Sequence, residues 1–175
     1  MEYFFDYSKA SDCIDHDILL TKLDYLGVRG KPLKLFKSYL HMRKQKTLYM
    51  DELSNTADIL YGVPQGSILG PLLFFIYIND VVNSSKLLNF SLFADDKTAF
   101  MCDNNSSSLF RRVNRELVNV NDWVICNKLS LNMDKTVFML FTNVVYQEPF
   151  LPLKIGNAFI EFIKLNFWDL SLTID

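Results

Sequence analysis

Apolar and polar positions alternate along the chain with two different spacings, which predict a mixture of strands and helices. Residues 3–7 form a short aromatic run of the kind found in buried strands. From His16 to Leu26 the apolar positions return at every third or fourth residue, which predicts a helix that ends at Gly27. A second helix is expected from Pro32, because proline fits the first turn of a helix.

The middle and the end of the chain continue this mixture. Ser67 is expected to cap a helix over residues 69–77, and apolar spacing predicts a longer helix over 106–127. A polar loop at 52–56 and a two-residue link at Asp96-Lys97 each separate two apolar runs, so two hairpins are expected. The predicted strands are residues 46–50, 59–63, 87–94, 98–102 and 137–141, with short strands between Leu151 and Ile174.

This order of elements predicts a single α+β domain over residues 1–175, with an antiparallel sheet and helices packed on one of its faces. The composition agrees with a globular domain, since 50% of the 175 residues are hydrophobic and 22% are charged. No repeat, low-complexity tract or linker divides the sequence.

Several classes of protein are excluded by what the sequence lacks. It has no run of about eighteen or more apolar residues, so neither a transmembrane helix nor a membrane partner is expected. The segment Met1–Asp6 lacks the basic start and apolar stretch of a signal peptide. The cysteines are scattered, which indicates neither a disulfide framework nor a zinc site. We therefore expect an intracellular protein of the cytoplasm or nucleus, not a secreted one.

Positive charge is concentrated between Arg29 and Lys46. The formal net charge of the chain is −2, but this segment carries seven basic residues and no acidic residue. Such a segment is either the solvated face of a helix or a surface that binds a phosphate backbone. The sequence leaves both interpretations open.

Candidate chemistry begins with carboxylates at the ends of apolar runs. Asp95 and Asp96 follow one predicted strand, and Asp6 follows the first aromatic strand. Adjacent buried carboxylates repel one another, and a divalent cation such as Mg²⁺ removes that repulsion. If the first strand lies beside the 87–94 strand, the three side chains form a site for two metal ions about 4 Å apart. Solvated turn residues would give the same pattern in isolation.

A glycine-rich loop precedes the helix that is expected at 69–77. Residues 62–71 read Gly-Val-Pro-Gln-Gly-Ser-Ile-Leu-Gly-Pro. The glycines permit backbone conformations that other residues avoid, and Pro64 stiffens the segment. The loop is suited to lie against a base pair or a sugar and to present Gln65 to it. The alternative interpretation is an ordinary turn into the helix.

Taken together, these segments resemble the reverse transcriptases of non-LTR, LINE-like retrotransposons. Residues 5–16 resemble the first palm motif of that family, 62–71 its Pro-Gln-Gly motif and 93–96 its double-aspartate motif. Residues 123–136 resemble the fourth motif, and 167–175 resemble a degraded form of the fifth. The motifs follow one another in the family's order and cover nearly the whole chain.

The resemblance implies the palm of an RNA-directed DNA polymerase, with fingers and thumb largely missing from these residues. Such an enzyme transfers deoxynucleotides to a primer 3′ end with two Mg²⁺ ions, or with Mn²⁺ in their place. Its partners would be an RNA template, a DNA primer and deoxynucleotide triphosphates. The 175-residue chain alone is expected to be inactive.

The resemblance also implies roles for individual residues. Asp6, Asp95 and Asp96 would bind the metal ions, and Lys135 would donate a proton to the leaving pyrophosphate. The residues implied at the incoming nucleotide and the template are Ser11, Pro64, Gln65 and Gly66.

Two residues depart from the family's pattern. Ser11 stands where the family usually has a Phe or Tyr that blocks a ribose 2′-hydroxyl. Lys97 stands where Thr is common, and its charge is expected either to compete with the metal ions or to point to solvent. Two other interpretations remain: a catalytically dead relic that keeps the palm fold, and a different palm-like metal enzyme such as a nucleotide cyclase. The Pro-Gln-Gly loop argues against a cyclase, which holds no template.

Overall fold

The computed structural model describes residues 1–64, 66–93, 96–142 and 151–163. They form two compact units. The sheet unit comprises Met1–Ser8, Val81–Val124 and the described part of Leu131–Asp175. The helical unit comprises Lys9–Asp80 and Ile125–Ser130.

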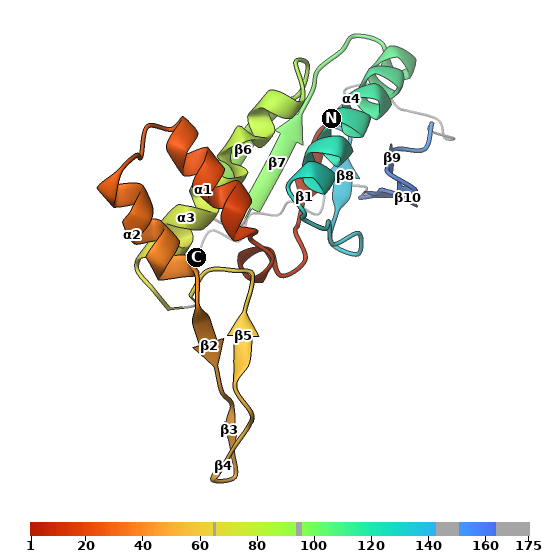
Figure 1. Ribbon diagram of the computed structural model, residues 1–175. Helices are drawn as coiled ribbons and strands as arrows, with labels where there is room; N and C mark the ends of the chain where they lie inside the picture. Colours follow the sequence, from red (N-terminus) through yellow and green to blue (C-terminus); the bar gives the residue numbers. More distant parts are fainter. Residues whose placement is uncertain (65, 94–95, 143–150, 164–175) are drawn as a thin grey trace, which may run out of the picture. The chain divides into compact units, whose positions relative to one another are not determined.

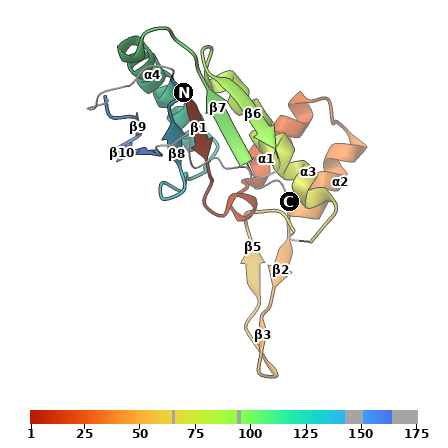
Figure 2. The same ribbon diagram turned by 180° about the vertical axis from the view of Figure 1, so that it is seen from behind.

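The sheet unit is built on a five-stranded sheet with the order β11-β8-β1-β7-β6, and Figures 1 and 2 show β1 between β7 and β8. Its strands are β1 (Glu2–Phe5), β6 (Asn89–Phe93), β7 (Asp96–Phe100), β8 (Val137–Met139) and β11 (Glu161–Phe162). Neighbouring strands are antiparallel except β11, which runs parallel to β8. A separate two-stranded sheet joins β9 (Lys154–Ile155) to β10 (Ala158–Phe159).

Helix α4 (Ser106–Cys126) packs its apolar stripe against one face of this sheet. The predicted helical positions Leu109, Val113, Leu117, Val120 and Val124 are all buried. From β1, Tyr3 and Phe5 enter the same core, while the alternate residues Glu2 and Phe4 are only half-buried. This alternation fits the period of a strand with one covered face. Each large apolar side chain in such a core contributes about 1.5–3 kcal/mol.

The helical unit contains α1 (His16–Tyr25), α2 (Lys31–Leu40), α3 (Leu69–Ile78) and the 3-10 turn η1 (Ala10–Asp12). A second 3-10 segment, η2 (Asn79–Ser84), follows α3. Helix α1 packs against both α2 and α3. All three helices begin within two residues of the predicted positions. For α1 the signals are local, since Asp15 caps its start and Gly27, with a φ of +92°, follows its end.

A long hairpin leaves the end of α2, as Figure 1 shows. It pairs β2 (Arg43–Gln45) with β5 (Ala57–Ile59), and β3 (Leu48–Tyr49) with β4 (Glu52–Leu53). The predicted hairpin is confirmed, but its strands and its loop lie at other residues than the sequence predicts. Nearly every residue of the ribbon is exposed. Its strands therefore need no apolar pattern, and the chain turns at Met50-Asp51 rather than at 52–56.

Two further expectations about the sheet are wrong. Strand β7 begins at Asp96, so Asp96 and Lys97 belong to a strand and not to the link between strands. Strand β1 pairs with β7 and β8, so it does not lie beside β6, the strand found within residues 87–94. The tail motif at 167–175 lies outside the described residues. None of the helices in the described residues combines the length and the hydropathy that a membrane crossing requires.

Candidate functional site

Asp6 immediately follows β1, on the side of the sheet opposite the α4 core. Its neighbours Phe5 and Tyr7 are each 6% exposed, whereas the side chain of Asp6 is 34% exposed. Successive side chains of an extended chain point to opposite faces, which accounts for this difference in exposure. The carboxylate is therefore held at a strand end while remaining accessible.

The strand register brings Asp6 towards the double aspartate. The last printed pair between β1 and β7 is Phe5 with Lys97, so the next position would set Asp6 across from Asp96. Ala94, Asp95 and the side chain of Asp96 lie outside what the structure describes. Within the described residues no three His, Cys, Asp or Glu side chains form a metal-binding group.

Lys135 lies beside Asp6. Its Nζ is 3.6 Å from Asp6 Oδ2, and its side chain is 70% exposed. Asn132 approaches the same carboxylate oxygen, with Nδ2 donating over 3.2 Å. The structure thus brings the first and fourth motifs together at Asp6.

Lys97 does not point to solvent, which corrects one of the two expectations for its charge. The residue is 4% exposed, and its Nζ lies 4.8 Å from the centre of the Tyr7 ring. Since Lys97 pairs with Phe5, which lies in the core, the alternation of side chains along a strand places Lys97 on the covered face of the sheet, away from solvent. A cation over an aromatic ring is a favourable arrangement when water is excluded.

In the helical unit, the Pro-Gln-Gly loop is anchored to the end of the first motif. The N–H of Val63 donates to the Ser11 carbonyl over 3.0 Å, and the N–H of Gly62 donates to the Ile14 carbonyl over 2.8 Å. Nε2 of the buried His16 is 2.8 Å from the Gly62 carbonyl. Ser11 and the loop are therefore neighbours, as the implied nucleotide site requires.

Ser67 closes the loop and starts α3. Its Oγ donates to the Pro64 carbonyl over 2.7 Å and accepts from the Gly70 N–H over 2.9 Å. The predicted capping role of Ser67 is confirmed. Pro64 is half-buried and Gly66 is exposed, while Gln65 lies outside the described residues.

The helical unit also contains a hydrogen-bonded cluster that the sequence does not predict. Lys128 Nζ donates to Asp15 Oδ2 over 2.6 Å, and the Tyr77 hydroxyl donates to the Asn127 carbonyl over 2.7 Å. Burial raises the pKa of Tyr77 to about 12, so its hydroxyl keeps its proton at neutral pH. The one signal in the sequence was Asp15, an Asp directly before a helix.

Opposing forces set the pKa of Asp15. Burial alone would raise the pKa, but the hydrogen bond from Lys128 and those from the backbone N–H groups of Ile18 and Asp17 outweigh it. The pKa of Asp15 therefore lies below its usual value. The same hydrogen bond raises the pKa of Lys128. Asp15 thus remains charged and fixes Lys128, the start of the fourth-motif loop, to α1.

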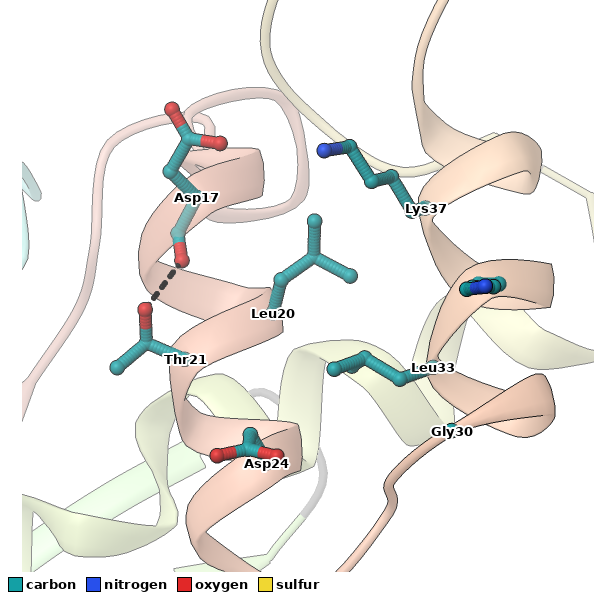
Figure 3. Close-up of a pocket in the computed structure, with 8 residues that line it drawn as sticks. Asp17, Leu20, Thr21, Asp24, Gly30, Leu33 and Lys37 are labelled. Atoms are coloured by element: carbon teal, nitrogen blue, oxygen red, sulfur yellow. Dashed lines mark hydrogen bonds between the residues drawn. The ribbon is translucent and has the colours of Figure 1, made fainter.

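A cavity of about 520 Å³ lies between α1 and α2 (Figure 3). Leu20 and Leu33 face one another across it, with Asp17 and Asp24 on the α1 side and Lys37 on the α2 side. It contains none of the residues that the sequence motifs indicate. It is a gap between two helices with opposite charges on its walls.

The family model for "Reverse transcriptase (RNA-dependent DNA polymerase)" matches residues 2–163. The chain belongs to the reverse transcriptase family. The match includes Asp6, the double aspartate, the Pro-Gln-Gly loop and Lys135.

Curated relatives of this reverse transcriptase chain are polymerases of mobile elements. It is 26% identical to the probable RNA-directed DNA polymerase from transposon BS of Drosophila melanogaster, covering 90% of this chain and 18% of the relative. It is 27% identical to the polymerase from mobile element jockey of Drosophila funebris, covering 83% and 17%. The polymerase from the Drosophila melanogaster X-element is 33% identical over 53% of this chain and 11% of that protein. The resemblance to retrotransposon reverse transcriptases is confirmed, and the chain spans less than a fifth of the length of these relatives.

A solved structure of telomerase from Candida albicans, in complex with a fragment of telomeric RNA, has a similar fold. The TM-score is 0.58 at 15% sequence identity, covering 91% of this reverse transcriptase chain and 30% of that chain. The predicted α+β fold of the palm type is confirmed.

Proposed function

We propose that residues 1–175 form the palm domain of a retrotransposon polymerase that copies RNA into DNA, with Asp6, Asp95 and Asp96 as ligands of two divalent cations. The observation that carries this proposal is the β1–β7 register, which leads Asp6 towards Asp96 at one end of the sheet. We propose that residues 5–16, 62–71, 93–96 and 123–136 are the first four motifs of the palm, as the resemblance implies. Residues 167–175 would be the fifth motif, which holds the primer and is called the primer grip.

Asp6 has the properties of a cation ligand. Both contacts to its carboxylate, from Asn132 and Lys135, fall on Oδ2. Among the described residues, no hydrogen bond or ion pair reaches Oδ1. A carboxylate with one oxygen fixed and the other open suits Mg²⁺, which takes oxygen ligands and retains some of its water.

When bound, two Mg²⁺ or Mn²⁺ ions would activate the primer hydroxyl and stabilise the departing pyrophosphate. We assign to Lys135 the donation of a proton to that leaving group, and the position of its exposed ammonium beside Asp6 supports this role. The Lys135 ammonium approaches Asp6 Oδ2 and not Oδ1, so Oδ1 remains available to a cation.

The anchored loop of the helical unit carries a separate part of the proposal. Backbone hydrogen bonds hold Gly62 and Val63 against the first motif, next to Ser11. We assign Pro64, Gln65 and Gly66 to contact the template and the incoming nucleotide. Ser11 would lie at the sugar, where a small side chain admits a 2′-hydroxyl.

The proposed partners are an RNA template, a DNA primer and deoxynucleotide triphosphates, and the reaction would take place inside the cell where these meet. The basic segment from Arg29 to Lys46 supports contact with a phosphate backbone. Its lysines on α2, Lys31, Lys34 and Lys37, are exposed. Because the chain covers only part of its relatives, polymerisation is proposed for a protein of their length.

The test uses a version of the protein extended to the length of its curated relatives. With a primed RNA template and Mg²⁺, it should extend the primer, and Asp95→Asn should abolish extension without changing the circular dichroism spectrum. Asp122→Asn, on the exposed side of α4, is the matched control and should remain active. An extended protein that folds but makes no product would contradict the proposal and favour the catalytically dead relic.

A further inference from the structure

Asn132 contacts Asp6 through both its backbone and its side chain. The backbone N–H of Asn132 donates to the Asp6 carbonyl over 2.8 Å. Its side-chain Nδ2 donates to Asp6 Oδ2 over 3.2 Å. The two residues are 126 positions apart, so this double contact fixes the fourth motif to the end of β1.

The same residue closes the turn that carries Lys135. The Asn132 carbonyl accepts hydrogen bonds from the Lys135 N–H at 3.2 Å, the Thr136 N–H at 2.9 Å and the Thr136 Oγ1 at 2.8 Å. Thr136 has no exposed surface, so the far end of the turn is held in the core. Asn132 thus both contacts Asp6 and closes the turn that carries Lys135.

The two kinds of contact have different consequences. The backbone contacts shape the turn and would survive any side-chain substitution. The side-chain amide contacts the Asp6 carboxylate, to which Nδ2 donates a hydrogen bond without carrying a charge. A cation at this position would neutralise Asp6, and an apolar side chain would leave the carboxylate free to rotate. A neutral donor fixes Oδ2 without adding a second positive charge to the one that Lys135 already brings to this oxygen.

We infer that Asn132 is a positioning residue: its side-chain amide orients the Asp6 carboxylate for cation binding, while its backbone carbonyl holds the turn that carries Lys135. The inference rests on the proposed function for the role of the cation. The orientation of Asp6 itself requires no cation. Removing a hydrogen-bond partner of a ligand typically weakens metal affinity by about 10–100-fold, so the effect is measurable.

The experiment compares Asn132→Ala with Thr136→Val in the 175-residue chain. Thr136→Val removes a donor from the same turn but leaves the contact between Asn132 and Asp6. Asn132→Leu, which is close in size and lacks the donor, serves if the alanine variant does not fold. Mg²⁺ titration calorimetry gives the affinity, with Asp6→Asn to identify binding at this site. The carboxyl ¹³C resonance of Asp6, recorded without metal, reports its orientation.

Asn132→Ala should weaken Asp6-dependent Mg²⁺ binding about tenfold and shift the Asp6 resonance, while Thr136→Val changes affinity less than about twofold. An unchanged affinity and resonance in Asn132→Ala would overturn the inference and leave the metal site standing. Equal effects of both variants would also overturn it, because the turn alone would then explain them. If the unmodified chain shows no Asp6-dependent binding, the proposed metal site fails. The resonance then decides the inference, with a shift in Asn132→Ala alone supporting it and no shift refuting it.

Discussion

At Ser11, a small side chain lies next to the loop that carries Pro64, because the Val63 N–H donates to the Ser11 carbonyl. If Ser11 lies at the sugar, as proposed, a Phe or Tyr in its place would clash with a ribose 2′-hydroxyl, and the serine hydroxymethyl group would not. We predict that the extended polymerase incorporates ribonucleotides more readily than a Ser11→Phe variant. Single-nucleotide incorporation assays give the ratio of kcat/KM for deoxy- and ribonucleotides in both proteins. The same ratio in both would show that another residue excludes the 2′-hydroxyl.

Asp15 provides a pH-dependent contribution to stability. Because its pKa is lower in the folded chain than in the unfolded chain, its contribution is present above the unfolded pKa of about 4 and is lost as the pH falls through the folded value. Asp15→Asn keeps an oxygen for the helix cap but loses the ion pair with Lys128. We expect about 0.5–1 kcal/mol less free energy of unfolding at pH 7, since Lys128 is mostly exposed.

Urea denaturation from pH 2 to pH 8 measures this difference. The gap between the wild-type chain and Asp15→Asn should close as the pH drops below the folded pKa. Asp134→Asn, which changes an exposed carboxylate, should follow the wild-type curve. A constant gap at all pH values would mean that the ion pair does not stabilise the fold.

Among the elements, the loop before α3 places the strictest demand on one residue. Gly62 has a φ of +81°, and a Cβ built there would lie 2.9 Å from the Asp12 Cα. Gly66 has a similar φ of +74°, but nothing lies within 4 Å of its Cβ position. A side chain at Gly66 would therefore cause backbone strain alone, whereas one at Gly62 would cause both strain and a steric clash.

We predict that Gly62→Ala destabilises the chain by about 3 kcal/mol, through strain and a clash with backbone atoms. Gly66→Ala should cost only about 1 kcal/mol, through strain alone. Thermal and urea unfolding of both variants gives the comparison. Equal destabilisation would show that the loop moves away from the first motif without cost.

For the whole molecule, we predict that the 175 residues alone extend no primer. Phosphoryl transfer depends on holding the triphosphate in line with the primer end, and affinity for nucleic acid comes from many neutralised phosphates. One basic segment on a chain of net charge −2 supplies few of these contacts. The assay combines the purified chain with a primed RNA template, Mg²⁺ and labelled deoxynucleotides. Extension that disappears in Asp95→Asn would contradict the prediction.

The sequence by itself determined the features that depend on local spacing. The stripe from Leu109 to Val124 predicted α4, whose apolar face is buried, and the aromatic run before Asp6 predicted a buried strand. Caps at Asp15 and Ser67 placed two helix starts. Motif order was sufficient for the family, because each motif is a short contiguous run. These features need only the period of a helix or a strand and the chemistry of adjacent residues.

Tertiary structure alone decided which distant segments meet. The position of β7 between β1 and β6, and the burial of Lys97 over Tyr7, follow from strand pairing and register. The contact of Asn132 with Asp6 joins residues that are 126 positions apart in the chain. A local pattern states which face of a strand is apolar, but not which strand lies beside it. That choice depends on how all apolar faces are buried together, and it determined which groups surround the Asp6 carboxylate.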